Sequence, residues 1–455
     1  MSFSIVILAA GQGTRMRSNL PKVLQPLAGR PLLAHVLDAA QAAGAAGVHV
    51  VYGFGGESVR EAMTGHEVSW ALQAEQLGTG HAVSQALPGV PEDHVVVVLY
   101  GDVPLIRPDT IRRLVASAEP DHLSLLTARL DDPTGYGRIV RDESGSVVRI
   151  VEQKDASAEE LAIHEINTGL LAAPAGRLTA WLNQVGNENA QGEFYLTDVI
   201  ALAAADGVHV VGEPALDLDE VAGINDRSQL AAAEAALRAR RADELMTEGA
   251  ILADPARIDV RGEVRCGRDV FIDVGVVFEG EVTIGDGARI GPYCVIRDSA
   301  IAPGAALLAY SHLEGANVGP DATVGPYGRL RPGANLAARS KVGNFVEIKK
   351  SDVGEGSKVN HLTYVGDATI GQDVNVGAGT ITCNYDGANK HRTVIGDRAF
   401  IGSGVELVAP VKVGEDATIA AGSTVTKPAP DGQLTVARGR QISVSGWKRP
   451  VKKKT

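Results

Sequence analysis

The sequence has few aromatic residues, few cysteines and no long apolar run, and each shortage excludes a class of protein. Aromatic residues make up only 4% of the 455 residues, as expected for a core built largely from stacked aliphatic side chains. The three cysteines, Cys266, Cys294 and Cys383, are widely spaced and form no CxxC pair. The sequence therefore predicts neither a disulfide framework nor a zinc site.

Signals for membrane insertion and secretion are also missing. No apolar run approaches the roughly 18 residues that a membrane span requires, and no signal peptide precedes the apolar run that begins at Ile5. We therefore expect a cytoplasmic protein with no membrane insertion.

Charge is unevenly distributed along the chain. The net charge is −12 and the pI is about 5.4, which argues against nucleic acid as a partner. The one basic run is the C-terminal tail, residues 448–454. This run is interpreted either as a solvated terminus or as a clamp on an anionic ligand, and the sequence leaves both alternatives open.

The most informative feature that is present is a repeat of six residues. Small aliphatic residues recur in register at every sixth position over residues 260–296, 301–313, 318–348 and 395–425. This period fits neither an α-helix, with about 3.6 residues per turn, nor a plain strand, with a period of about two. It predicts a parallel β-helix whose coils stack one aliphatic side chain per face. Left-handed helices of this hexapeptide kind are best known from trimeric acyltransferases, so the similarity also suggests acyl transfer.

The first half of the chain has a different pattern. Apolar runs such as Ser4–Ala10 and Val95–Tyr100 alternate with amphipathic segments, which is typical of an α/β domain with a largely parallel sheet. An Ala-, Glu- and Arg-rich segment then begins after Asp226 and ends at Gly249, which predicts a long connecting helix. We expect three parts: an α/β domain over residues 1–226, a linker helix over 227–249, and a β-helix domain with a C-terminal tail over 250–455.

A glycine-rich turn follows the first predicted strand. The segment Gly11-Gln12-Gly13-Thr14-Arg15-Met16 lacks the P-loop pattern, but its free N–H groups are suited to phosphates. Arg15 and Lys22 can add charge-assisted hydrogen bonds to the same oxygens. With GxGTRM followed by PKxL, the chain resembles the sugar-1-phosphate nucleotidyltransferases. In-line attack on the α-phosphorus of a nucleotide needs positioning and charge neutralisation, which Arg15, Lys22 and Mg²⁺ can supply.

Other polar residues of the first half agree with this resemblance. Asp102 follows the apolar run 95–100, and one carboxylate with substrate phosphates is a usual way to hold Mg²⁺. Asn225 would return as a second metal ligand. A pyrimidine edge would be contacted by Gln73, Gly78 and Thr79. Sugar hydroxyls and an acetamido group would be bound near Gly137, Glu152 and Asn167.

Polar residues also interrupt the hexapeptide region. Arg331, Lys349, His361 and Tyr364 lie on successive stretches of predicted coil, where packing does not require them. Arginine and lysine would bind a phosphate, and His361, with a reference pKa of about 6.5, could accept the proton of an attacking amine. The insertion between Thr380 and Thr393 breaks the ladder and should protrude as a loop.

Taken together, nearly the whole chain resembles the bacterial bifunctional N-acetylglucosamine-1-phosphate uridyltransferases / glucosamine-1-phosphate N-acetyltransferases. The resemblance includes Asp254-Pro255-Ala256-Arg257 and Trp447-Lys448-Arg449-Pro450. It implies a Rossmann-like nucleotidyltransferase domain joined by a long helix to a left-handed parallel β-helix, in a homotrimer. The implied reactions are acetyl transfer from acetyl-CoA to glucosamine 1-phosphate, then uridylyl transfer from UTP with release of pyrophosphate. The product would feed peptidoglycan and lipopolysaccharide precursor synthesis.

The same resemblance implies a role for each matching residue, with Arg15 and Lys22 catalytic in uridylyl transfer. The nucleotide or UDP-sugar would be bound by Leu8, Ala9, Ala10, Gly11, Lys22, Gln73, Gly78, Thr79, Tyr100, Gly101, Gly137, Glu152, Asn167 and Asn225. The metal ligands would be Asp102 and Asn225. Glucosamine 1-phosphate would be bound by Arg331, Lys349, Tyr364 and Asn375, with His361 as proton acceptor. Acetyl-CoA would be bound by Ala378, Asn384, Tyr385, Ser403, Ala421 and Arg438. The sequence departs from the family at Gly439, where a proline often follows the arginine.

Two alternatives compete with this interpretation. In a single-activity sugar-1-phosphate nucleotidyltransferase the β-helix would serve assembly alone, which does not explain the polar cluster around His361. In a non-catalytic nucleotide-exchange subunit the N-terminal site would be degenerate, whereas the GxGTRM motif, Lys22 and Asp102 are intact here.

Overall fold

The computed structural model describes residues 2–118 and 122–452. The chain divides into two compact units, Met1–Leu237 and Arg238–Thr455, and the division falls within helix α8 (Arg227–Glu248). Lys453 and Lys454 of the basic C-terminal run lie outside the described residues.

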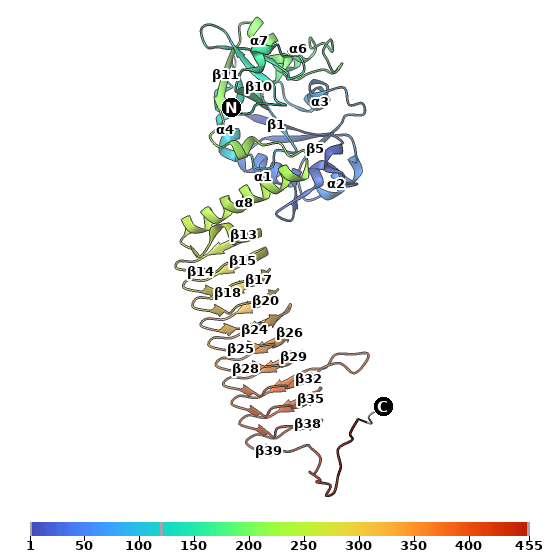
Figure 1. Ribbon diagram of the computed structural model, residues 1–455, viewed down its shortest axis with the longest axis vertical. Helices are drawn as coiled ribbons and strands as arrows, with labels where there is room; N and C mark the ends of the chain where they lie inside the picture. The colour runs from blue at the N-terminus through green and yellow to red at the C-terminus, as the bar shows by residue number, and fades with distance from the viewer. Residues whose placement is uncertain (1, 119–121, 453–455) are drawn as a thin grey trace. The chain divides into compact units, whose positions relative to one another are not determined.

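The first unit is built on a mixed, mostly parallel sheet (Figure 1). β6, β1, β4 and β5 are parallel, as are β11 and β7, whereas β10 runs antiparallel to β6 and β7. In spatial order the main strands are β11 (His209–Pro214), β7 (His122–Arg129), β10 (Glu165–Pro174), β6 (Val95–Tyr100), β1 (Phe3–Ala9), β4 (Gly47–Tyr52) and β5 (Ser69–Leu72). β8 (Arg138–Arg141) and β9 (Val147–Val151) also belong to this sheet, through the pairing of β8 with β10, whereas β2 (Pro26–Leu27) and β3 (Arg30–Pro31) form a separate two-stranded sheet.

Helices cover both faces of this sheet. Ile5 and Ile7 of β1 enter a core shared with α1, α2 and α4, whereas Val6 enters a second core shared with α3, α6 and α7. Because both faces are buried, the strands are continuous apolar runs, as the sequence predicted. The helices are α1 (Leu32–Ala43), α2 (Gly56–Ala62), α3 (Thr79–Ala86), α4 (Pro108–Ser117), α5 (Ala158–Leu161), α6 (Ala175–Leu182) and α7 (Asp198–Ala205), with 3-10 turns at Thr14–Met16, Lys22–Leu24, Leu87–Gly89 and Leu218–Val221.

Helix α8 begins where the sequence predicted, but its N-terminal cap differs in detail. The Asp226 Oδ1 atom accepts hydrogen bonds from the backbone N–H groups of Ser228 and Gln229, at 3.0 and 2.9 Å. The Gln229 side chain accepts from the backbone N–H of Asn225, at 2.7 Å, rather than from that of Asp226. The helix ends at Gly249, whose φ of 111° lies in the region that favours glycine. The cap therefore ties Asn225 to the first turn of α8.

The second unit is a left-handed parallel β-helix of hexapeptide repeats. Leu307 pairs with Val324, and Val324 with Val342, so that a coil takes 17 or 18 residues. A full coil is therefore three hexapeptides, one per face, which confirms the predicted origin of the six-residue period. The ladder residues on the three faces, such as Ile290, Ile348 and Val353, are buried in one continuous core.

One face of the β-helix is an 11-stranded sheet in the part of the chain that the structure describes. Its strands are β12 (Ile251–Leu252), β14 (Phe271–Ile272), β16 (Arg289–Ile290), β19 (Ala306–Leu307), β22 (Thr323–Val324), β25 (Lys341–Asn344), β28 (Lys358–His361), β31 (Asn375–Val376), β34 (Phe400–Ile401), β37 (Thr418–Ile419) and β39 (Leu434–Thr435).

The other two faces belong to a 17-stranded sheet, again counted over the described residues, and β13 (Asp259–Cys266) and β15 (Val277–Ile284) run across both. The second face continues with β17 (Val295–Arg297), β20 (His312–Glu314), β23 (Arg329–Leu330), β26 (Glu347–Lys349), β29 (Tyr364–Gly366), β32 (Ile381–Cys383), β35 (Glu406–Val408) and β38 (Thr424–Val425). The third face continues with β18 (Ala300–Ile301), β21 (Asn317–Val318), β24 (Ala334–Leu336), β27 (Ser351–Val353), β30 (Ala368–Ile370), β33 (Thr393–Ile395) and β36 (Val411–Val413). The predicted insertion lies between β32 and β33 and stands away from the coils (Figure 1).

The corner between the 11-stranded sheet and the second face, here called the first corner, carries a column of stacked aromatic rings. Tyr293, Tyr310, Tyr327 and Phe345 follow one another with ring centroids 5.2, 5.0 and 5.1 Å apart. All four have positive φ, a conformation that costs an L-residue about 1–2 kcal/mol. Leu362 continues the column, and its φ is also positive. We call Tyr293, Tyr310, Tyr327 and Phe345 the aromatic column.

If the ladder is the main source of stability, replacing a leucine by alanine should destabilise the protein strongly inside the ladder and very little outside it. Leu313 is fully buried, whereas Leu434 is 66% exposed. Leu313→Ala should lower the free energy of unfolding by about 2–5 kcal/mol and the thermal midpoint by several degrees. Leu434→Ala should stay within about 0.5 kcal/mol of the parent. Thermal unfolding followed by circular dichroism would measure both midpoints, and equal losses would contradict a core built from the ladder.

Candidate active sites

A pocket of about 220 Å³ opens where β1 and β6 end in the first unit. The two strands are neighbours, and the backbone N–H of Gly101 donates to the carbonyl of Leu8 at 2.9 Å, which brings their following loops together. Ten residues predicted to bind nucleotide or metal line the pocket: Leu8, Ala9, Ala10, Gly11, Lys22, Gln73, Gly78, Thr79, Tyr100 and Asp102. Gln76 and Glu193 also line it, although the sequence analysis did not select them.

Three polar side chains converge at the inner end of this pocket. The Lys22 Nζ atom forms an ion pair with Asp102 and donates a hydrogen bond to Asn225 Oδ1 at 3.1 Å. Asn225 reaches this position because the backbone N–H of Ile224 donates to the carbonyl of Asp102 at 2.9 Å. Residues more than a hundred positions apart thus present a carboxylate oxygen and an amide oxygen to one cation.

These oxygens have the chemistry that Mg²⁺ prefers. Mg²⁺ binds through one or two carboxylates together with substrate phosphates, and Asp102 and Asn225 supply hard oxygen donors of this type. Among the described residues, no three His, Cys, Asp or Glu side chains gather into a metal site. A metal at this position would therefore depend on Asp102, Asn225 and the phosphates of a bound nucleotide.

The glycine-rich turn brings Lys22 close to the backbone. Gly13 has a φ of 63°, and a Cβ atom there would lie 2.5 Å from the Cβ of Lys22, so only glycine fits. Arg15 lies on the next turn and is exposed. Backbone and hydroxyl hydrogen bonds from Gln229 and Ser228 lower the pKa of Asp226, and the charge of Arg15 adds to that effect. Arg15 does not line the pocket, and its proposed contact with phosphate oxygens stays a prediction.

The predicted base-binding residues are held around the start of α3. The Gln73 amide donates to the carbonyl of Gly78 at 3.1 Å, and the Thr79 hydroxyl oxygen accepts from the backbone N–H of Leu196 at 3.0 Å. Gly78 has a φ of 112°, and a Cβ atom there would lie 2.6 Å from the Phe194 carbonyl oxygen. The loop before α3 is therefore fixed by contacts with residues 194–196.

One of the predicted sugar-binding residues, Glu152, lines a second hollow of about 310 Å³ together with Asp155, Tyr195, Thr197 and Asp198, whereas Gly137 and Asn167 are not part of its lining. The Thr197 hydroxyl donates to Glu152 at 3.1 Å. Burial raises the pKa of Glu152, although the hydrogen bond from Thr197 opposes the shift. The sequence analysis missed Thr197, which carries no motif and is recognised only through its contact with Glu152.

Gly137 immediately precedes β8, and Asn167 lies on β10, which pairs with β8; Gly137 lies beside Glu152, and Gly169 of β10 lies beside Tyr100. The backbone N–H of Asn167 donates to the carbonyl of Gly137 at 2.9 Å, and the Asn167 side chain accepts from the N–H of Gly169 at 2.9 Å. A Cβ atom at Gly169 would lie 2.7 Å from the ring of Tyr100. Burial, together with the charges of Asp102 and Glu152, raises the pKa of Tyr100, which keeps its hydroxyl neutral.

The β-helix brings the second predicted group together on adjacent coils. Arg331 follows β23, Lys349 ends β26 and Tyr364 begins β29. These three strands pair in that order on the second face. Arg331 donates to Glu347 at 2.8 Å. The Lys390 ammonium lowers the pKa of Lys349, with smaller contributions from burial and from Arg331. Three cations therefore gather here, and such a cluster is suited to a phosphate.

Lys390 was missed by the sequence analysis. It lies in the insertion between β32 and β33, where Tyr385 and Lys390 form an isolated antiparallel bridge. The Asn384 amide donates to Asp367 at 2.6 Å and lies 3.5 Å from the Tyr364 hydroxyl oxygen. The insertion thus adds a lysine to the face that carries Tyr364, and the hexapeptide pattern contains no signal for it.

His361 lies at the first corner, at the end of β28. Its Nδ1 atom is 2.7 Å from Asn344 Oδ1, and Asn344 is the register partner of His361 on the preceding coil. The ring is exposed, and its backbone carbonyl accepts from the N–H of Gly379 on the next coil at 3.2 Å. A histidine with one ring nitrogen engaged and an exposed ring can exchange a proton with a ligand.

Three of the predicted acetyl-CoA residues, Ala378, Ser403 and Ala421, lie along the same corner, whereas Asn384 and Tyr385 lie in the insertion after β32. The Ala378 carbonyl accepts from Gly404, and the Ser403 carbonyl accepts from Gly422, both at 2.8 Å. The Arg438 guanidinium donates to the carbonyl of Ala421 at 2.7 Å. The column of large apolar side chains ends at Leu362, and Gly379, Gly404 and Gly422 take the corresponding positive-φ positions on the following coils. Asn375 lies on the 11-stranded sheet, paired with Lys358 and Phe400.

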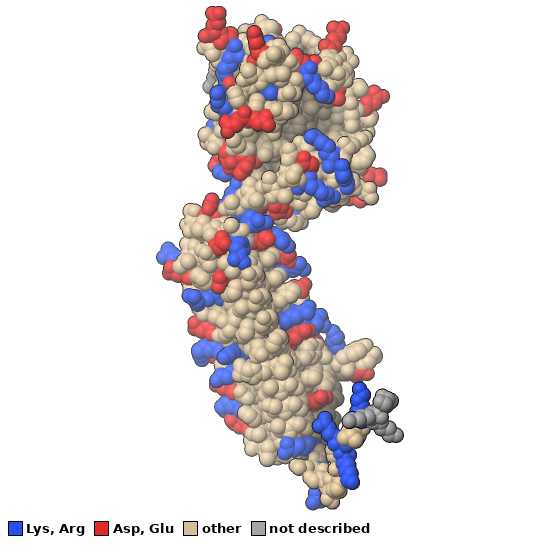
Figure 2. Space-filling view, in the orientation of Figure 1, with Lys and Arg blue, Asp and Glu red and all other residues tan. Residues whose placement is uncertain are grey.

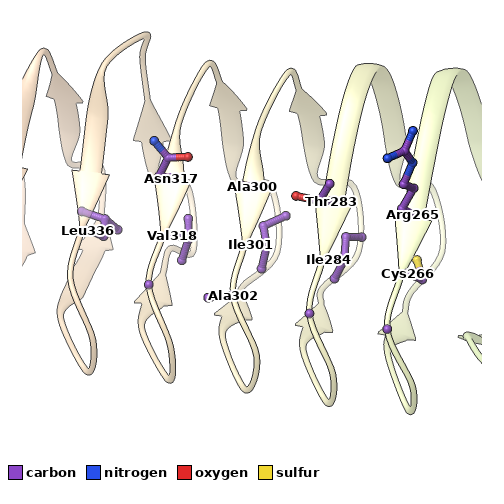
Figure 3. A pocket seen from close by; sticks show the side chains of 13 residues that line it. Arg265, Cys266, Thr283, Ile284, Ala300, Ile301, Ala302, Asn317, Val318 and Leu336 are labelled. Atoms are coloured by element: carbon purple, nitrogen blue, oxygen red, sulfur yellow. The ribbon is translucent and has the colours of Figure 1, made fainter.

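A larger hollow of about 610 Å³ lies elsewhere on the β-helix and contains none of the predicted site residues (Figure 3). It follows a corner of small residues, Gly267, Gly285, Ala302 and Gly319. Coil stacking accounts for these residues: a Cβ atom at Gly285 or Gly319 would lie 2.5 Å from the backbone of the next coil. The hollow is a consequence of coil geometry.

Within the described residues, no helix is long and apolar enough to cross a membrane.

Comparisons with known proteins match both units. A family model described as a MobA-like NTP transferase domain matches residues 5–176, and a model described as bacterial transferase hexapeptide (six repeats) matches residues 263–298 and 392–427. The chain is 58% identical to the Bifunctional protein GlmU of Marinobacter nauticus, over 98% of this chain and 99% of the relative. It is 58% identical to that of Alkalilimnicola ehrlichii and 57% identical to that of Azoarcus sp., over 99% of this chain and 97% and 100% of the relatives.

These relatives extend over both units, which favours the bifunctional interpretation over a nucleotidyltransferase with a purely structural β-helix. The chain belongs to the bifunctional GlmU family, whose acetyltransferase and uridyltransferase activities together produce UDP-N-acetylglucosamine.

Proposed function

We propose that the pocket at the end of β1 and β6 carries out uridylyl transfer and that the first corner of the β-helix carries out acetyl transfer. The convergence of Lys22, Asp102 and Asn225 supports the first assignment. The cation cluster of Arg331, Lys349 and Lys390, on the coils around His361, supports the second. We take residues 1–226, 227–249 and 250–455 as uridyltransferase domain, linker helix and acetyltransferase domain.

In uridylyl transfer, a phosphate oxygen of N-acetylglucosamine 1-phosphate attacks the α-phosphorus of UTP, and the bond to pyrophosphate breaks. Lys22 and Arg15 provide positive charge for the phosphate oxygens as charge moves onto the leaving group. The nucleotide would lie against the backbone of residues 8–11, which lines the pocket, and against Gly101, which is hydrogen bonded to Leu8. The loop that contains Gln73, Gly78 and Thr79 contacts the uracil edge.

Asp102 and Asn225 would hold Mg²⁺. When bound, the ion neutralises charge on the triphosphate and orients its oxygens. Gly137, Glu152 and Asn167 bind the sugar and its acetamido group, and Tyr100 donates from a hydroxyl that burial keeps neutral. The Thr197 hydrogen bond fixes the Glu152 carboxylate for this purpose.

In acetyl transfer, the amine of glucosamine 1-phosphate attacks the thioester carbonyl of acetyl-CoA. His361 accepts the proton that the amine loses, and the C–S bond breaks to release CoA. Arg331 and Lys349 bind the phosphate together with Lys390, while Tyr364 and Asn375 position the sugar. Ala378, Asn384, Tyr385, Ser403, Ala421 and Arg438 lie along the coils that would hold acetyl-CoA.

We also propose that the protein is a homotrimer whose contacts include the aromatic column. The four rings are between 42% and 56% exposed, and Leu362 is 64% exposed, so that a single chain leaves an apolar ridge in water. The ridge repeats once per coil along the β-helix. A second copy of this β-helix offers a surface with the same repeat, and closed symmetry would bury the ridge in every protomer. The ridge ends at Leu362, which follows His361 in the sequence. A second protomer packed on the ridge would therefore extend along the coils that are proposed to bind acetyl-CoA.

The proposed setting is the cytoplasm, where UDP-N-acetylglucosamine would supply peptidoglycan and lipopolysaccharide precursors. Acetylation comes first, since the uridylyl acceptor is the acetylated sugar phosphate. The substrates are small molecules. Neither nucleic acid nor a membrane is proposed as a partner, because the chain carries a net charge of −12 and the one basic run of its sequence is the tail.

Removal of the Asp102 carboxylate should abolish one activity and spare the other. Asp102→Ala deletes the ion pair with Lys22 and a proposed metal ligand, so uridylyl transfer should fall by about 10²–10³-fold or more. Acetyl transfer in the same preparation should be unchanged, because the two proposed sites share no residue. Asp109→Ala, which removes an exposed carboxylate from α4, is the matched control and should keep both activities. Loss of acetyl transfer by folded Asp102→Ala protein would refute the division into two sites.

His361 and Lys349 should affect different kinetic parameters of acetyl transfer. His361→Ala removes the proposed base and should lower kcat by about 10²–10⁴-fold with little change in KM. Lys349→Ala weakens phosphate binding and should raise the KM for glucosamine 1-phosphate by roughly 10–100-fold. His312→Ala, an exposed histidine on β20, is the matched control and should behave as the parent. Near-normal kcat in His361→Ala would leave the base unassigned.

Charge placed on the aromatic column should disrupt assembly and acetyl transfer together. The double variant Tyr310→Glu/Tyr327→Glu would bury two carboxylates at the proposed contact, an arrangement that destabilises an interface strongly. Light scattering should then show monomers, with acetyl transfer lost and uridylyl transfer retained. Leu216→Glu, at an 81% exposed position of the first unit, should remain trimeric. A trimeric double variant with full acetyl transfer would place the contact elsewhere.

A further inference from the structure

We infer that Asn344 is a positioning residue for acetyl transfer, because it fixes the proton of His361 on Nδ1. The inference rests on the proposed role of His361 as base and adds to it the residue that makes the ring competent. Asn344 would not touch either substrate. It would act only through the imidazole.

The geometry is specific. Asn344 Oδ1 lies 2.7 Å from His361 Nδ1, and the two residues are register partners at the ends of β25 and β28. An amide oxygen can accept a hydrogen bond but cannot donate one. The neutral ring therefore carries its proton on Nδ1 and presents the lone pair of Nε2. A base must have a free lone pair, so this tautomer is the one that can accept the proton of the amine.

Other hydrogen bonds restrain the backbones of Asn344 and His361, and they do not involve the Nε2 atom of His361. The backbone N–H of Leu362 donates to the carbonyl of Asn344 at 3.1 Å, and the hydroxyl of Thr363 donates to the carbonyl of His361 at 2.7 Å. Both backbones are therefore held within the coil stack. No other side-chain hydrogen bond to the His361 ring is found among the described residues, so the Asn344 amide is the contact that sets its orientation and tautomer.

An uncharged acceptor has a further effect on the pH range of the base. A carboxylate in this position would attract the proton onto the ring and raise the pKa of His361, which would keep it protonated at neutral pH. An amide fixes the tautomer without adding a negative charge. A carboxylate and an amide at position 344 therefore differ in the charge that they place beside the ring.

Two variants test this inference through different readouts. Asn344→Ala removes the acceptor, so kcat for acetyl transfer should fall by about tenfold while the KM values of both substrates stay within about twofold. Asn344→Asp keeps an acceptor and adds charge. It should retain most of kcat at high pH, and the acidic limb of its pH profile should move upward by about one pH unit. The shift has this sign because a raised pKa requires a higher pH to free the base.

Asn317→Ala is the matched control. The Asn317 amide also makes a side-chain contact between coils, since it donates to Asn335 Oδ1 at 2.8 Å, but Asn317 lies on the third face away from His361. It should change neither kcat nor the pH profile. Uridylyl transfer and the thermal midpoint of every variant report whether the protein is folded. If Asn344→Ala is unstable, the pH profile of Asn344→Asp tests the inference alone.

The outcomes separate this inference from the assignment of the base. Unchanged kcat in Asn344→Ala, or an unshifted pH profile in Asn344→Asp, would overturn the role of Asn344 while His361→Ala still loses activity. Equal losses of kcat in both variants without a pH shift would assign Asn344 to coil structure and also overturn it. Full activity of His361→Ala would instead overturn the proposed base itself.

Discussion

The hydrogen bonds between successive coils are the constraint on which the β-helix and its proposed site depend. Successive coils pair in parallel, most often over 17 or 18 residues, as in Leu307 with Val324 and Val324 with Val342. The pairing stacks buried aliphatic residues into one core, and it also stacks the outward residues into columns. Asn344 lies against His361 for the same reason that Val342 lies against Val359. A site on this fold is therefore assembled from residues one coil apart.

The first unit achieves the same result with a parallel sheet. Adjacent strands β1 and β6 end at the same edge, so the turn after β1 and Asp102 after β6 line one pocket. Asn225 is more than a hundred residues away in the sequence, and the backbone hydrogen bond from Ile224 to Asp102 brings it close to them. Glycines at positions 13 and 169 allow Lys22 and Tyr100 to approach the backbone, where a Cβ atom would collide. Rigid strands thus place the charges, and small residues leave room for them.

Much of the fold could be predicted because it depends on patterns that are local in sequence. The six-residue ladder predicted the β-helix, and GxGTRM with Lys22 and Asp102 predicted a nucleotide site. The structure places Gly11, Lys22 and Asp102 around one pocket, and nucleotide binding there stays a prediction. Lys390, Thr197 and Asn344 were not selected because their relevance comes from a neighbour brought close by folding. Arg15 is exposed and does not line the pocket, so its contact with the phosphates stays a prediction. The spacing of residues in the sequence reveals those of one motif, whereas contacts between different motifs depend on how the strands pair in the folded protein.

The insertion between β32 and β33 has a consequence for how this fold tolerates changes in chain length. Thr382 pairs with Leu407 and Ile370 with Ile395, so one coil contains 25 residues, yet the strands on either side keep their partners. Residues inserted at a corner form a surface loop, and the chain then rejoins the stack of coils. The stabilising contacts remain those between neighbouring coils. Such a solenoid behaves as a one-dimensional array in which loops can be gained or lost independently. Chemistry can thus be added at a corner, as with Lys390, without redesign of the core beneath it.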